Sequence, residues 1–237
     1  MRQDGSKFYL LWYLLPFISS WALHRPALVT VLIVLWFFRD KLPDPWARFR
    51  AWRRSVTLRR EIEANPANLS AAEGLMEAYL ASGRRAEAER TALSLIDRMR
   101  NEVPRRGTPE GEAHAFYVVA LARADSNPEG ALEAIIQCVD VSPGFRQGEP
   151  YALAGRALES LGRYEQAEEA YERWTECNRS SLAGHRGLSR VRAKLGRAQD
   201  ARKAVQEGLS VYRTLPRFRR VQERRDWLAL LWTRVFA

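Results

Sequence analysis

Apolar residues recur at helical spacing along most of the chain, and short breaks containing glycine and polar residues interrupt them. The clearest example is Tyr151–Trp174, where two periodic stretches flank a Leu-Gly-Arg break centred on Gly162. Apolar residues every three to four positions predict amphipathic helices, and a glycine directly after such a stretch predicts a helix end. Small residues such as Ala154 and Ala167 are expected where the two helices touch, with large ones such as Tyr171 around them. The pattern therefore predicts a helical hairpin.

Similar hairpins recur along the chain. The alanine of the Gly-Arg-x-x-x-Ala phrase at Ala167 returns as Ala201, thirty-four positions later, and related phrases contain Ala88 and Ala131. This pattern resembles the tetratricopeptide repeat (TPR) family, whose helix-turn-helix units of about 34 residues carry small and large residues at fixed offsets. The four expected units span residues 69–100, 112–143, 148–179 and 182–213.

The resemblance implies an all-α fold, an α-solenoid of about four TPR-like helix pairs spanning residues 69–213. One pair cannot bury its own apolar face, so neighbouring units bury it jointly and the ends need caps. Residues 214–237 are expected to form a single capping helix that closes the array, because Arg217–Phe236 follows Pro216 and has an apolar face. The apolar residues of the repeats are therefore expected to form the core.

Residues 1–44 are expected to form a membrane anchor, because Phe8–Phe38 is almost continuously apolar. A helix that crosses a bilayer needs about 20 residues. The His24-Arg25-Pro26 break allows a helical hairpin, and a single tilted span is the other solution. A buried soluble hairpin and a cleaved signal peptide are less favoured alternatives. Arginines follow Phe38 closely, and basic residues near a membrane segment stay in the cytoplasm, so the repeats are expected at the cytoplasmic face of a bacterial inner membrane.

Residues 45–68 predict a basic amphipathic helix beside the anchor. Aromatic residues and Val56 fall at helical spacing, and arginines occupy the other faces. Such a helix can lie in the interface of an anionic membrane, or it can pack its aromatic stripe on the first repeat. The expected membrane-interface residues are Trp46, Phe49, Arg50, Trp52, Arg53 and Arg54.

The composition argues for a binding protein rather than an enzyme. The net charge is +10, but nearly all the basic residues are arginines and no nucleic-acid-binding motif accompanies them, so nucleic acid is not an expected partner. The three histidines are scattered, and no nucleophile-base order, phosphate-binding glycine loop or metal-ligand spacing is present. We expect no catalysis, cofactor or metal.

The resemblance implies that the first helix of each unit lines a concave groove that binds a protein partner. The groove residues expected from it are Glu73, Glu77, Phe116, Tyr117, Arg123, Arg156, Arg186 and Arg190. Chaperone-binding members of the family hold a terminal carboxylate with lysine and asparagine. Matching positions here hold Glu73, Glu77, Ala152 and Arg156, so that clamp is not expected.

These observations favour a membrane-anchored scaffold or adaptor that binds a peptide or helix of a protein partner in the groove. The alternative is a structural assembly subunit whose apolar hairpin packs on other membrane helices.

Overall fold

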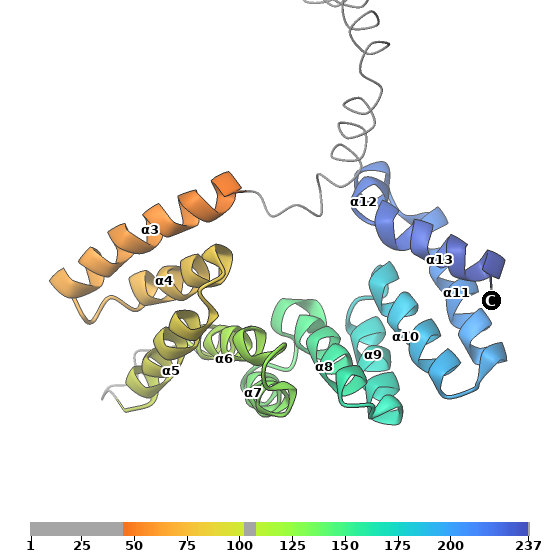
Figure 1. The fold of residues 1–237 in the computed structure, drawn as a ribbon, viewed down its shortest axis with the longest axis horizontal. Coiled ribbons are helices and arrows are strands. Elements are labelled where there is room, and N and C mark those ends of the chain that lie inside the picture. Colours follow the sequence, from red (N-terminus) through yellow and green to blue (C-terminus); the bar gives the residue numbers. More distant parts are fainter. Residues whose placement is uncertain (1–44, 102–107, 237) are drawn as a thin grey trace, which may run out of the picture. The chain divides into compact units, whose positions relative to one another are not determined.

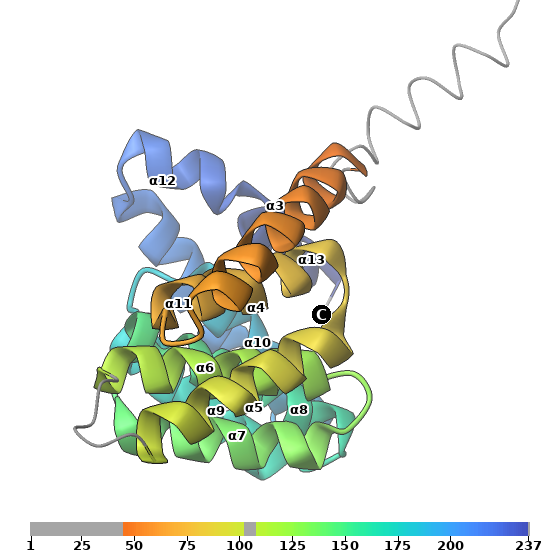
Figure 2. The ribbon, with the colours of Figure 1, turned by 90° about the vertical axis from the view of Figure 1, so that its left-hand side faces the viewer.

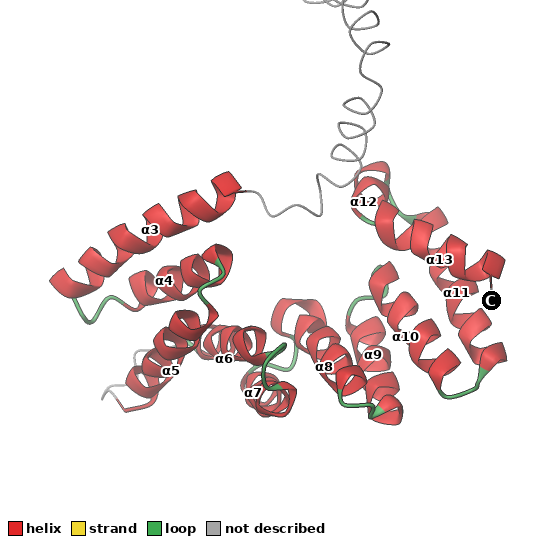
Figure 3. Ribbon diagram, viewed as in Figure 1, coloured by secondary structure: helices red, strands yellow, loops and turns green. Residues whose placement is uncertain are grey.

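The computed structural model describes residues 45–101 and 108–236. The chain divides into two compact units, Met1–Trp46 and Ala47–Ala237, and almost all described residues belong to the second. The expected membrane segment at residues 1–44 lies outside the described residues. Every regular element of the described residues is a helix (Figure 3). None of those helices has both the length and the apolar character that crossing a membrane would require.

Four helix pairs occupy the four stretches in which the repeats were expected. They are α4 (Leu69–Ser82) with α5 (Arg85–Asn101), α6 (Pro109–Arg123) with α7 (Pro128–Val141), α8 (Glu149–Ser160) with α9 (Tyr164–Cys177), and α10 (Leu182–Lys194) with α11 (Ala198–Thr214). The first helices lie on the inner side of the stack and the second helices on its outer side (Figure 1). Viewed along the stack, successive pairs lie behind one another (Figure 2). The expectation of an α-solenoid is confirmed.

The helix ends follow from local sequence. Asn68, Thr108, Asn127 and Ser181 each accept a hydrogen bond from the backbone N–H three residues later, which satisfies a donor that the first helical turn leaves unpaired. Between the helices of three pairs, a glycine with φ of 72–83° makes the turn, a conformation that only glycine adopts without strain. The recurring Gly-Arg phrase is therefore the turn itself.

The interior is one continuous apolar core with a smaller second core at the end. The main core runs from α4 to α11 and contains fully buried alanines at the helix contacts, including Ala88, Ala167 and Ala204. The second core contains Leu182, Leu209 and Leu230 among others, and joins α10 and α11 to the C-terminal helices. The second core therefore holds the C-terminal end of the array in place.

The C-terminal segment forms two helices instead of the single helix expected. They are α12 (Arg217–Gln222) and α13 (Arg224–Phe236), separated at Glu223. Arg220 of α12 donates hydrogen bonds to the carbonyls of Leu215 and Arg213, while Leu230 of α13 is completely buried. Because of this break, α12 binds the backbone at the end of α11 through Arg220, while α13 buries Leu230.

Helix α3 (Pro45–Ala64) covers the other end of the array. Its buried or half-buried side chains are Ala51, Ser55, Leu58 and Ile62, which lie at helical spacing on one face. This face packs on α4: a Cβ added at Gly74 would stand 3.2 Å from Cδ1 of Leu58. The α3 helix therefore acts as an N-terminal cap.

Candidate concave binding site

A pocket of about 300 Å³ opens between first helices of adjacent units. Four of the eight expected groove residues line it: Tyr117 from α6, Arg156 from α8, and Arg186 and Arg190 from α10. The other residues that line it are Glu149, Ala152, Tyr171, Trp174 and Ala183. Residues from four helices thus meet at one place, and three of the nine are arginines.

Tyr171 forms the floor of this pocket and fixes the spacing of its walls. A Cβ added at Gly155 of α8 or at Gly187 of α10 would stand 2.7 Å from the Tyr171 ring. The ring therefore fits between two first helices because both carry glycine at the contact. The Tyr171 hydroxyl donates a hydrogen bond of 2.6 Å to Glu159.

Arg190 joins the same network. Its Nε and one terminal nitrogen donate to the two oxygens of Glu159 at 2.7 and 2.6 Å, a bidentate geometry that is among the strongest charge-assisted pairings. Burial alone would raise the pKa of Glu159, but the hydrogen bonds from Arg190 and Tyr171 outweigh it and hold that pKa below its usual range. Arg190 therefore links α8 to α10 as well as lining the pocket.

Two side chains of the pocket have buried donors without an acceptor. Arg186 pairs with Asp226 of α13 at 2.7 Å through one terminal nitrogen, while its Nε has no hydrogen-bond partner among the described residues. The indole Nε1 of Trp174 is also buried and has no hydrogen-bond partner in the described part of the chain. A buried donor without an acceptor costs free energy, so an acceptor supplied by a ligand would be favourable here. Arg156 is exposed, and no ion pair of its guanidinium is found in the described part of the chain.

Tyr117 forms the wall towards the preceding unit. Its side chain is only 6% exposed, and its ring lies 5.7 Å from the ring of Phe145. Burial, followed by the neighbouring Glu149 carboxylate, raises the pKa of Tyr117 to about 12. The phenol is protonated at neutral pH, as an ordinary tyrosine is, and it can offer a hydrogen-bond donor to a ligand.

Arg146 is a site residue that the sequence did not indicate. It lies between α7 and α8, where Arg146 and Gln147 have φ of 44° and 55°, a left-handed conformation that is costly for residues other than glycine. This backbone places the guanidinium 5.6 Å from the centre of the Tyr117 ring and 5.5 Å from that of Phe145. Nothing in the sequence around Arg146 marks it for a left-handed conformation.

Arg146 also reaches the first unit, where it meets the expected groove residue Glu77. Its guanidinium lies 3.7 Å from the Glu77 carboxylate and 3.3 Å from Nε2 of His114. Glu73 lies on the same helix as Glu77, and burial together with the Glu77 charge raises the pKa of Glu73. Glu73 and Glu77 thus form an acidic region of α4, apart from the pocket.

The two remaining expected groove residues lie elsewhere. Phe116 and Arg123 line a different pocket, of about 410 Å³, together with residues of α5 and α7. Arg123 pairs with Glu89 of α5 at 2.7 Å, and Arg100 of α5 lies 5.0 Å from the centre of the Phe116 ring. Adjacent positions on a helix differ in direction by about 100°, so Tyr117 faces the concave pocket while Phe116 faces the second helices.

The expected membrane-interface residues lie on the exposed faces of α3. Trp46, Phe49 and Trp52 are 71%, 47% and 48% exposed, and Arg50, Arg53 and Arg54 are exposed as well. The helix packs on α4 with a different face, so the alternative in which the aromatic stripe packs on the first repeat is wrong.

Within residues 45–101 and 108–236, no group of three or more metal-ligating side chains comes together.

No family model matches the sequence, and no curated protein matches it. Solved structures of MamA have a similar fold. One MamA crystal structure aligns with a TM-score of 0.58 at 16% identity, covering 66% of this chain and 85% of that one. A MamA fragment from Desulfovibrio magneticus RS-1, residue 41 to the end, aligns with a TM-score of 0.58 at 14% identity and covers 70% of this chain and 92% of that one. At these identities the likeness establishes the fold alone, which is an α-solenoid of the TPR type.

Proposed function

We propose that this protein is a scaffold, held at a bacterial inner membrane by residues 1–44, that binds a peptide or helix of a protein partner on the concave side of its repeats. The repeats face the cytoplasm in this proposal, and the arginines of α3 contact anionic lipid. The protein has no catalytic role.

The concave pocket is the observation that carries this proposal. Arg156, Arg186 and Trp174 line one cavity, and the last two have buried donors that lack acceptors. A peptide offers backbone carbonyls and carboxylates, which are the acceptors that such donors need. The TPR-type fold supports the proposal, because stacked repeats create extended concave binding surfaces.

Arg156→Gln is the most direct test, because replacing Arg186 or Arg190 would also break links between helices. One charge-assisted contact contributes about 1.5–3 kcal/mol, so losing it should weaken partner binding by about tenfold or more. Arg173→Gln is the matched control, since Arg173 lies on the neighbouring α9 and is 60% exposed. Binding is measured with a partner purified on the full-length, detergent-solubilised protein.

The same pair of variants separates the scaffold from the assembly subunit. A scaffold loses its partner with Arg156→Gln and keeps it with Arg173→Gln. A subunit held only by its apolar segment keeps its complex with both, and that result would remove the concave pocket from the function.

The anchor is tested by membrane extraction. Full-length protein should stay with the membrane in high salt and in carbonate, because burial of apolar surface is insensitive to ionic strength. Release by salt alone would show electrostatic attachment and exclude the anchor. A fragment of residues 47–237 is the control and should remain in the supernatant under carbonate.

A further inference from the structure

The outer surface of α12 and α13 combines exposed apolar side chains with exposed cations. Phe218 and Val221 of α12 are 67% and 76% exposed, and Leu228 and Trp232 of α13 are 51% and 67% exposed. The C-terminal helices α12 and α13 thus bury Leu230 but leave these four apolar side chains at the surface. A cap that only closed the array would have a polar outer face.

The charges of this segment are segregated. Residues 217–236 contain six arginines and two carboxylates. Both carboxylates turn towards α10: Asp226 pairs with Arg186, and Glu223 is half-buried and accepts a hydrogen bond from the Leu182 backbone. Among the described residues no ion pair is found for Arg217, Arg224 or Arg234, so these three exposed arginines leave positive charge at the surface of this segment.

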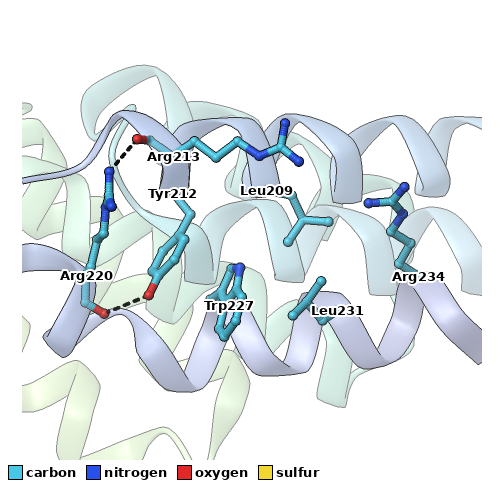
Figure 4. Close-up of a pocket in the computed structure, with 7 residues that line it drawn as sticks. All are labelled: Leu209, Tyr212, Arg213, Arg220, Trp227, Leu231 and Arg234. Carbon is cyan, nitrogen blue, oxygen red and sulfur yellow. Dashed lines mark hydrogen bonds between the residues drawn. The ribbon is translucent and has the colours of Figure 1, made fainter.

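A pocket of about 470 Å³ lies between α11 and α13 at the same end of the array. Tyr212 and Trp227 stack inside it with ring centres 5.0 Å apart, and Leu209 and Leu231 continue its apolar side. Arg213, Arg220 and Arg234 lie around these residues (Figure 4). None of the residues that line this pocket is acidic.

We propose that the exposed surface of α12–α13, with this pocket, binds the surface of an anionic phospholipid bilayer. Interfacial helices combine arginine or lysine on their polar face with tryptophan, phenylalanine or leucine on their apolar face, and arginine holds phosphate groups with paired hydrogen bonds. In α12 the exposed Arg217 precedes the exposed Phe218, and in α13 the exposed Arg224 and Leu228 lie four positions apart, on one side of the helix. A protein partner would have to supply several carboxylates, whereas an anionic bilayer supplies many phosphates together with the apolar boundary that Phe218 and Leu228 need. This contact does not depend on residues 1–44 or on the concave pocket.

The test measures how close α13 lies to lipid in the full-length protein. Cys177 is exposed and Cys138 is buried, so Cys177→Ser gives a background for single labels. A bimane label at Leu228→Cys is compared with one at Gln199→Cys, an exposed position at the start of α11. The protein is placed in nanodiscs of phosphatidylcholine alone, or of phosphatidylcholine with phosphatidylglycerol, that contain a nitroxide-labelled lipid.

In the anionic nanodiscs, we expect quenching at position 228 to be at least about threefold stronger than at 199. In nanodiscs of phosphatidylcholine alone, quenching at position 228 should fall to the level seen at position 199. In anionic nanodiscs, the Arg217→Glu and Arg224→Glu substitutions should lower it to the same level. The matched pair Arg173→Glu and Arg179→Glu on and after α9 should leave it unchanged. Attachment by residues 1–44 alone would not make the difference between the two positions depend on lipid charge or on Arg217 and Arg224.

Equal quenching at the two positions, or quenching at 228 that ignores lipid charge, would overturn the proposal. A second measurement exposes the label at position 228 to an aqueous quencher in detergent and in bilayers. If the label is shielded equally in both, protein covers this surface. That outcome would overturn the proposal too.

Discussion

Tyr171 occupies a space that two glycines leave open, and this contact sets the distance between α8 and α10. Its ring lies where side chains on Gly155 and Gly187 would stand, and its hydroxyl joins the Glu159–Arg190 pair. A single residue of a second helix thus packs two first helices together and fixes the floor of the concave pocket.

Gly155→Ala should therefore destabilise the protein, although alanine is the better helix former. The added Cβ would stand 2.7 Å from the ring, and overpacking of this kind costs about 1–3 kcal/mol. The measurement is the free energy of unfolding in urea. Gly144→Ala is the control, because its Cβ would have no neighbour within 4 Å and should have little effect; equal effects would contradict the close contact.

The Glu159–Arg190 pair should make stability depend on acid pH. Because folding lowers the pKa of Glu159, its ionised form stabilises the protein above the usual glutamate pKa of about 4.3. This contribution is lost as the pH falls through the lowered pKa. Between about pH 5 and about pH 3, the natural protein should lose more stability than Glu159→Gln. Urea midpoints measure both, and parallel losses would contradict the assignment. Glu73 and Glu223, whose pKa values are raised, are present in both proteins and cancel in the difference.

At the scale of elements, α3 shows that two apolar stripes can share one helix. The aromatic stripe attracts attention in the sequence, but Ala51, Ser55, Leu58 and Ile62 form the face that packs on α4. This second stripe contains a serine and an alanine, and so gives a weak periodic signal. Ser55 is 2% exposed, and its hydroxyl donates to the Trp52 carbonyl, which satisfies its polar group inside the contact.

Substitutions on the two stripes should therefore differ. Leu58→Asp should lower the free energy of unfolding by about 1–3 kcal/mol, because a carboxylate is placed against α4. Trp52→Ser should change it by less than about 0.5 kcal/mol, as is usual for surface positions. Both are measured by urea unfolding of the 47–237 fragment. A larger effect from Trp52→Ser would mean that the aromatic stripe is the packing face.

At the scale of the second compact unit, the array depends on caps at both ends. Helix α3 covers the inner side of α4, where Arg59 donates a 2.5 Å hydrogen bond to the Tyr79 hydroxyl, and α13 covers the last pair through Leu230. Repeat arrays gain stability from interfaces between neighbours, so an uncovered end is destabilised.

Removing the N-terminal cap should consequently lower stability. We expect a fragment of residues 65–237 to melt at least about 5 °C below one of residues 47–237, since 1 kcal/mol shifts the melting temperature of a domain of this size by about 2–4 °C. Circular dichroism measures both transitions. Equal melting temperatures would show that α3 adds nothing to the array and would leave it as a linker.

The repeats could be predicted because their signals are local. Glycine after an apolar-periodic stretch, an asparagine or serine cap, and alanine at a fixed offset act within a single hairpin, and each produces the same structure wherever it recurs. The four helix pairs and the place of Ala167 in the core follow from such signals alone.

The concave site could be predicted only in part. Tyr117, Arg156, Arg186 and Arg190 were placed by their offsets in the first helices, and the structure brings them to one pocket. The same offsets do not separate Phe116 and Arg123 from these four residues. One step along a helix turns the side chain to another face, and the sequence does not fix how α6 is rotated about its axis. Arg146 depends on a left-handed backbone that its own residue type disfavours, so only the surrounding structure can hold it there.

By itself, the sequence determined which segments are helices, where they turn and that they stack, because short-range capping and periodic burial decide these features. The tertiary structure decided which arginines pair and which line a pocket, which face of α3 is buried, and that the cap breaks at Glu223. These features depend on partners far away in the sequence, such as Glu159 for Arg190 and Asp226 for Arg186, and no local pattern specifies a partner at that distance.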